Sequence, residues 1–129
     1  MARILSVSYD NPLLRTRHML LETQGHEVVS SLGFIESLKH CHEGNFDLFL
    51  LGHSIPHSDK LQLAKTFREE CPAPIISLRR NAGEEPVDGA DYHIEPDPEP
   101  LLELVHKVLD RTQSSNQSGL RLNTRKPKK

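Results

Sequence analysis

The sequence has few cysteines and no long hydrophobic run, and these absences exclude several classes of protein. Cys41 and Cys71 are the only cysteines in 129 residues, which is too few for a disulfide framework. Both stand where helical patterns need apolar residues, so we expect buried free thiols and a cytoplasmic location. No run reaches 18 apolar residues, which predicts no membrane span. The segment Met1–Val7 turns polar too early for a signal peptide.

Acidic residues are missing from the last part of the chain. Residues 111–129 carry a formal charge of +6 without an Asp or Glu, whereas residues 1–110 carry −8 and the whole chain −2. The last segment is polar and shows no apolar period, so it cannot bury enough apolar surface to offset the entropy of ordering. We expect a folded domain over residues 1–110 and a disordered basic tail over residues 111–129.

Short apolar runs alternate with helical patterns along the first 110 residues. We expect strands near residues 4–7, 28–29, 47–51, 75–78 and 90–94. We expect helices that begin near Pro12, Gly33, Asp59 and Pro98, with Asp10 and Asp59 as caps of the first and third. This alternation predicts an α/β fold with a doubly wound, five-stranded parallel sheet.

The connection between the fourth and fifth strands is too short for an ordinary crossover helix. Glu95 follows Arg79 by only 16 positions, and the 15 residues between them must also hold the fifth strand. Residues 80–90 contain two glycines and a proline and show no apolar period. We expect the fourth helix to be shortened or absent, with a single short helix over residues 82–85 as the alternative.

Five segments of the sequence occur in an order that is informative about the fold. They are an opening strand with Ser8-Tyr9-Asp10, the turn Gly25-His26-Glu27-Val28, the strand Asp47–Leu51 followed by Gly52 and Pro56, the strand Ala73–Leu78, and the strand Gly89–Ile94 followed by Glu95-Pro96. In this order, over roughly residues 2–110, they resemble the response-regulator receiver domain, the CheY-like module of two-component signalling. The resemblance implies a flavodoxin/CheY-like fold, in which the carboxyl ends of the strands meet at one functional edge.

The chain departs from that family at the positions that carry its chemistry. Ser8 and Tyr9 stand where the family has two metal-binding acids, and only Asp10 remains nearby. Gly52 replaces the phosphate-accepting Asp, Arg79 the hydroxyl residue, and Glu95 the Lys. A receiver needs carboxylate oxygens for Mg²⁺ and a carboxylate nucleophile for the phosphoryl group. We therefore expect a degenerate phosphorylation pocket with no catalytic residue, metal or cofactor.

Two further expectations concern the fourth and fifth strands. The ends of neighbouring parallel strands lie close together, so Arg79 and Glu95 can form an ion pair inside the emptied pocket. Two independently solvated charges are the alternative. Tyr92 stands at the position of the family's switch aromatic. The alternative is that the Tyr92 ring simply packs on the sheet edge.

Eight histidines raise the question of a metal site. His53, His57 and His93 could face one edge of the sheet, which would suit Zn²⁺. No tight ligand spacing accompanies them, so we favour scattered surface histidines. No glycine-rich loop would support His53 as a phosphate acceptor, and no Ser-His-Asp or Cys-His arrangement occurs. The sequence therefore predicts a protein that is not an enzyme.

The leading hypothesis is a pseudo-receiver that acts in signalling through protein contacts, without phosphorylation. Its partner would be a protein of a signalling pathway, with a second copy of the chain as one option. In the family that is resembled, the face near the fourth and fifth strands and the last helix serves such contacts. The alternative is a small dimeric regulator whose basic tail binds nucleic acid.

Overall fold

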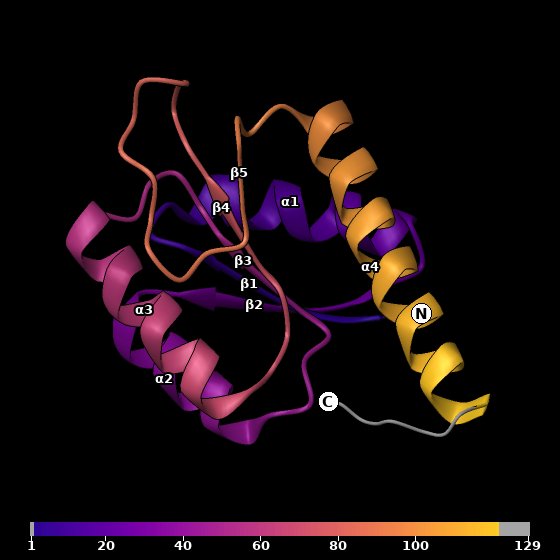
Figure 1. Cartoon of the computed structure of the whole chain (residues 1–129). Coiled ribbons are helices and arrows are strands. Elements are labelled where there is room, and N and C mark those ends of the chain that lie inside the picture. The colour runs from indigo at the N-terminus through magenta and orange to yellow at the C-terminus, as the bar shows by residue number, and fades with distance from the viewer. Residues whose placement is uncertain (1, 122–129) are drawn as a thin grey trace.

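Strands and helices alternate along the chain (Figure 1). The structure, a computed structural model, describes the backbone of residues 2–121 and the side chains of residues 2–110. The elements in chain order are β1 (Arg3–Ser8), α1 (Asn11–Thr23), β2 (Glu27–Leu32), α2 (Phe34–Glu43), β3 (Leu48–Leu51), α3 (His57–Glu70), β4 (Ile75–Leu78), β5 (Tyr92–Ile94) and α4 (Pro98–Arg121). No helix in the described part of the chain is both long and apolar enough to cross a bilayer.

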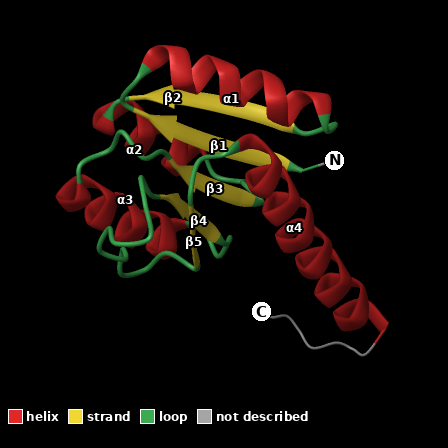
Figure 2. Ribbon diagram, turned by 90° about the horizontal axis from the view of Figure 1, so that it is seen from above, coloured by secondary structure: helices red, strands yellow, loops and turns green. Residues whose placement is uncertain are grey.

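All five strands belong to one parallel sheet, in the order β2-β1-β3-β4-β5. Helices α1 and α4 lie on one face and α2 and α3 on the other (Figure 2). The expected doubly wound α/β fold is therefore confirmed. Since every strand runs the same way, the residues that follow β1, β3, β4 and β5 gather at one edge.

Two apolar layers hold the helices to the sheet. Phe49 of β3 stacks on Phe67 of α3 with ring centroids 4.4 Å apart, in the layer beneath α2 and α3. The other layer joins Leu48 and Leu50 of β3 to Leu101 and Val105 of α4. Strand β3 is buried on both faces, as its unbroken apolar sequence predicts.

The connection from β4 to β5 contains no helix, which confirms the expectation from its length. Its apolar anchor is Val87, which is buried in the layer beneath α2 and α3. The Val87 N–H donates a 2.9 Å hydrogen bond to Nε2 of His93 on β5. Contacts of the Val87 residue thus fix this segment, which has no helical backbone hydrogen bonds to do so.

The helix ends confirm one expected cap and correct another. Asp10 caps α1, and its Oδ1 accepts the Leu13 N–H at 3.1 Å. Asp59 does not cap α3, because that helix begins two residues earlier, at His57, and has no side-chain cap. The expectation placed the start of α3 too late and overlooked a competing donor, the Tyr9 hydroxyl, which bonds to Asp59.

Helix α4 continues to Arg121, beyond the boundary predicted at Asp110. Residues 111–118 contain no glycine or proline, so nothing in their covalent structure stops the helix. The predicted tail thus begins with helical backbone. Its remainder, residues 122–129, lies outside the described residues, and the domain boundary stays a prediction.

The two thiols differ in burial, which predicts different reactivity. Cys41 is buried, whereas Cys71 is only half-buried because it follows the last turn of α3. Burial, aided by the charge of Glu70, raises the pKa of Cys41 to about 11. We expect a disulfide reagent at pH 8 to label native Cys71 readily and Cys41 only on unfolding, because the thiolate is the reactive form. Loss of the native labelling in Cys71→Ser would confirm the assignment, and its persistence would contradict it.

Candidate functional site

At the carboxyl end of β1, polar side chains bond to one another and to the backbone. Ser8 is fully buried, and its Oγ accepts the Asp10 N–H at 3.0 Å. The same hydroxyl lies 3.0 Å from Oγ of Ser54, in the loop after β3. The Ser54 hydroxyl also accepts the Tyr9 N–H at 3.0 Å. This network ties the β1 end to the β3–α3 loop through neutral groups.

The side chains of Tyr9 and Asp10 also form hydrogen bonds within the chain. The Tyr9 hydroxyl donates to Asp59 at 2.8 Å, and burial together with that carboxylate raises the pKa of Tyr9. The Asp10 carboxylate caps α1. The Mg²⁺ that the resemblance implies requires several carboxylate or water oxygens. Two hydroxyl side chains and one capping carboxylate do not fit that ion.

Gly52 lies at the end of β3, and the surrounding atoms leave no room for a side chain there. A Cβ atom at this position would lie 2.9 Å from the Val7 carbonyl oxygen, 3.1 Å from Nη1 of Arg17 and 3.5 Å from Cα of Ser8. Val7 O is also the acceptor for the Gly52 N–H, at 2.8 Å. An acidic side chain at position 52 would therefore require the backbone or Arg17 to move.

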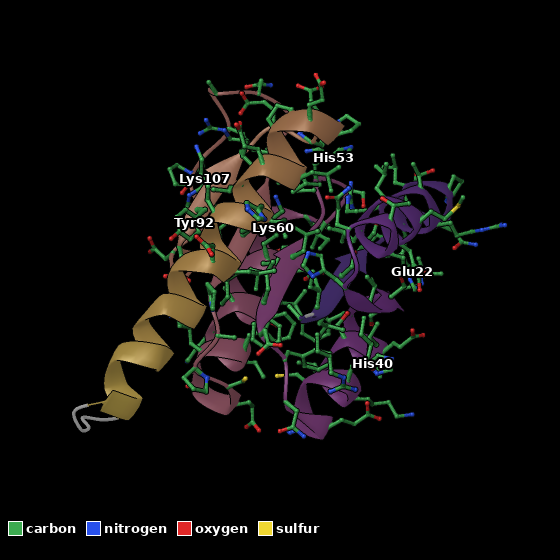
Figure 3. All side chains as sticks on the ribbon, turned by 90° about the vertical axis from the view of Figure 1, so that its right-hand side faces the viewer. Glu22, His40, His53, Lys60, Tyr92 and Lys107 are labelled. Carbon is green, nitrogen blue, oxygen red and sulfur yellow. The ribbon has the colours of Figure 1, made fainter. Side chains whose placement is uncertain are left out.

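A buried lysine occupies the edge between α3 and β4. Lys60 is 1% exposed, and its Nζ donates to the Leu78 carbonyl oxygen at 2.6 Å. The same Nζ lies 3.5 Å from the Glu84 carboxylate, whose other oxygen accepts the Arg80 N–H at 2.9 Å. Burial lowers the pKa of Lys60, while the charge of Glu84 opposes that shift. The pair therefore fastens the β4–β5 connection to α3 (Lys60 is labelled in Figure 3).

Arg79 and Glu95 form the ion pair that their reversed charges predict. Nε of Arg79 donates to Oε2 of Glu95 at 2.5 Å. The Arg79 N–H also donates to the Ile94 carbonyl oxygen at 2.9 Å. Both side chains remain partly exposed, so the pair contributes on the order of 1 kcal/mol or less to stability. Its main effect is to close the ends of β4 and β5 against each other.

The remaining candidates have separate surroundings. Tyr92 packs against the apolar layer that contains α4, which agrees with the packing alternative (Figure 3). His57 lies 3.6 Å from Glu85, and His93 accepts the Val87 N–H. Within residues 2–110, no three His, Cys, Asp or Glu side chains are grouped as metal ligands would be.

Comparison with known proteins identifies the family. No family model matches the chain. It is 32% identical over 120 aligned residues to the transcriptional regulatory protein SrrA of Staphylococcus aureus, covering 87% of this chain and 49% of SrrA. The response regulator TrrA of Thermotoga maritima, solved with Mg²⁺ and BeF, is 26% identical with a TM-score of 0.74, covering 84% of this chain and 99% of TrrA. A CheY-like receiver domain from Methanospirillum hungatei is 25% identical with a TM-score of 0.77, covering 89% and 98%.

The chain belongs to the response-regulator receiver family of two-component systems. It spans about half the length of the curated relatives that it matches. Receiver domains are in general signalling modules rather than enzymes. TrrA has also been solved in complex with the histidine kinase ThkA. The comparison with that structure gives 27% identity to this chain and a TM-score of 0.72.

Sequence reasoning missed two buried cations of this receiver domain. Arg17 is 5% exposed and Lys60 is 1% exposed, because each lies on the buried face of its helix among apolar residues. The signal was present in the spacing. Arg17 follows Leu14 by three residues and precedes Leu21 by four, and Lys60 precedes Leu63 and Ala64 by three and four.

Proposed function

We propose that this receiver domain works as a pseudo-receiver, a signalling module that acts through protein contacts without aspartyl phosphorylation. The observation that carries the proposal is Gly52. It supplies no carboxylate, and its surroundings at 2.9 and 3.1 Å exclude even a Cβ atom without rearrangement. Phosphoryl transfer to an aspartate requires that nucleophile, so the reaction has no acceptor at this position.

The other degenerate positions support the same proposal. Ser8, Tyr9 and Asp10 are engaged with Ser54, Asp59 and the start of α1. Arg79 and Glu95 satisfy each other. The groups that would bind a phosphoryl oxygen or a metal ion in other receivers are therefore replaced by internal hydrogen bonds and ion pairs.

The proposed partner is a protein of a two-component pathway, with a second copy of the chain as one candidate. TrrA, a relative in fold and sequence, binds a histidine kinase in a solved structure, which shows that this architecture can offer a surface to a signalling protein. The free thiols of Cys41 and Cys71 agree with a cytoplasmic location.

Incubation with Mg²⁺ and acetyl phosphate tests the proposal directly. We expect the intact mass of the protein to stay unchanged, because position 52 has no carboxylate. A receiver that keeps its acceptor aspartate, treated in parallel, should gain the mass of one phosphoryl group. A hydroxylamine-sensitive mass increase in this chain would show that another carboxylate accepts phosphate and would overturn the proposal.

A further inference from the structure

A serine, a histidine and a glutamate are in contact with one another between α1 and β2. Nδ1 of His18 lies 2.6 Å from Oγ of Ser30. Nε2 of the same ring lies 3.0 Å from Oε2 of Glu22, which is labelled in Figure 3. Residue spacing did not reveal this group, because His18 and Ser30 are 12 positions apart and belong to different elements. The three residues are separate from the degenerate pocket at the strand ends.

The neighbours of the His18 ring decide which of its nitrogens carries the hydrogen. A carboxylate accepts hydrogen bonds and has no hydrogen to donate, so the charge of Glu22 favours the hydrogen on Nε2. Nδ1 then keeps a lone pair, which accepts the Ser30 hydroxyl hydrogen across 2.6 Å. A serine hydroxyl that donates to a histidine base, with a third group beside that base, is the arrangement of a serine nucleophile.

Ser30 and His18 also line an open cavity of about 420 Å³ between α1 and β2. Its walls include the apolar side chains of Leu14 and Met19, and Met19 is 66% exposed. Ser30 is half-buried and belongs to the outer strand of the sheet, beside α1 (Figure 2). A small molecule can therefore reach the Ser30 hydroxyl from solvent and place an apolar group against the walls.

Asn11 and Arg15 supply the rest of the cavity lining. Both side chains are exposed and carry N–H donors. Such donors stabilise the negative charge that develops on a carbonyl oxygen during acyl transfer. The cavity thus combines a nucleophile, a base, apolar walls and hydrogen-bond donors, which are the parts that an acyl-transfer site requires.

We propose that Ser30, His18 and Glu22 form an acyl-transfer site that hydrolyses small carboxylic esters with a short aliphatic acyl group. Oγ of Ser30 attacks the carbonyl carbon while Nδ1 of His18 takes the hydroxyl proton. The bond to the alcohol oxygen breaks as His18 passes that proton to the leaving oxygen, and the acyl group stays on Ser30 as an ester. Water, deprotonated by the same nitrogen, then releases the carboxylic acid, and the proton returns to the serine oxygen. Ser30 and His18 are the catalytic residues, and Glu22 is a positioning residue for the ring.

Labelling of the full chain with an alkyl fluorophosphonate tests the site, because this probe bonds its phosphorus to a nucleophilic serine oxygen and releases fluoride. We expect a mass gain of one phosphonyl group, which peptide mapping places on Ser30. The labelling rate should fall by about a hundredfold or more in His18→Gln, which removes the base. Ser30→Ala should stay unlabelled. Ser58→Ala, which removes an exposed hydroxyl in the first turn of α3, should keep the wild-type rate.

Turnover of p-nitrophenyl butyrate tests the positioning role of Glu22. In Glu22→Gln the rate at saturating ester should fall by about tenfold, a modest loss because solvent screens this 54% exposed carboxylate. The half-saturating ester concentration should stay unchanged, because Glu22 contacts the base and does not line the cavity. A residue that only holds α1 against β2 would leave the rate at saturating ester unchanged, and that result would contradict the positioning role.

A wild-type chain without a label on Ser30 would overturn the acyl-transfer site, as would His18→Gln labelled at the wild-type rate. Should Ser30→Ala fail to fold, the position of the label in the wild type supplies the decision. The outcome is independent of the proposed function, because the fluorophosphonate reports on Ser30 and acetyl phosphate reports on a carboxylate. Turnover that requires Ser30 would also correct the sequence-based prediction that the chain is not an enzyme.

Discussion

Replacing Glu84 with alanine should lower the free energy of unfolding by about 2 to 3 kcal/mol. The substitution leaves the Lys60 ammonium, which is 1% exposed, with only the Leu78 carbonyl oxygen as an acceptor. An uncompensated charge in the interior is far more costly than a lost surface pair. Urea unfolding at pH 7, followed by circular dichroism, measures the change.

Glu85→Ala is the matched control for this prediction. Glu85 adjoins Glu84, but its side chain is 79% exposed, and its Oε2 lies 3.6 Å from Nε2 of His57. Its removal should change stability by no more than about 0.5 kcal/mol. Equal losses in the two variants would mean that Lys60 finds another acceptor and that the buried pair does not hold the β4–β5 connection.

The pH dependence of stability carries a signature of the same pair. Burial alone would raise the pKa of Glu84, but the Arg80 N–H and the charges of Lys60 and Arg80 lower it below 4.5. The stability it contributes is present above pH 4.5 and is lost as the pH falls through the folded pKa. Because the pKa of Lys60 is lowered from 10.5, stability rises with pH between its folded pKa and 10.5. The deficit of Glu84→Ala should therefore shrink at alkaline pH.

Gly52→Ala should destabilise the fold by about 1 to 3 kcal/mol, the usual cost of adding volume to a packed site. The added Cβ would lie 2.9 Å from the Val7 carbonyl oxygen, and that oxygen belongs to the backbone of a central strand. In Gly83→Ala, the control, the Cβ would lie 3.2 Å from Oδ1 of Asn81, an exposed side chain that can shift at the cost of only its surface hydrogen bond to the Gly83 N–H. Chemical denaturation of both variants measures the difference.

Gly52→Asp extends the test from stability to chemistry. We expect this variant to gain no phosphoryl group from acetyl phosphate, since Arg17 occupies the space of the acceptor and Ser8 and Tyr9 do not supply a metal site. A variant as stable as the wild type that also becomes phosphorylated would show that the site keeps its original geometry. That result would contradict the steric argument made from Gly52.

The apolar pattern was sufficient to predict the sheet, because central parallel strands are buried on both faces and read as unbroken apolar runs. Charge reversal at Arg79 and Glu95 likewise predicted a contact, since the strand order places these residues at neighbouring strand ends. Both inferences needed only periodicity and topology. They succeeded because regular elements constrain the positions of their residues strongly.

Lys60 and Arg17 show where sequence reasoning stopped. Periodicity could have marked each as a charge on an apolar face, but it could not have supplied the partner. Glu84 reaches Lys60 from an aperiodic loop whose path depends on the burial of Val87. Asp59 illustrates the same limit, because its partner Tyr9 lies 50 positions away in the chain. Such contacts depend on loop geometry, which residue spacing does not encode.

The cross-links around the β4–β5 connection bear on how this domain could be controlled. A molecular switch needs two arrangements of similar free energy, so that a modest input can exchange their populations. Three contacts lower the free energy of one of these arrangements relative to the other. They join Lys60 to Glu84, Arg79 to Glu95 and His93 to Val87. If covalent input is absent as proposed, the domain presents one constant surface. Output would then follow the amounts of the domain and its partner, through synthesis and degradation in the cell.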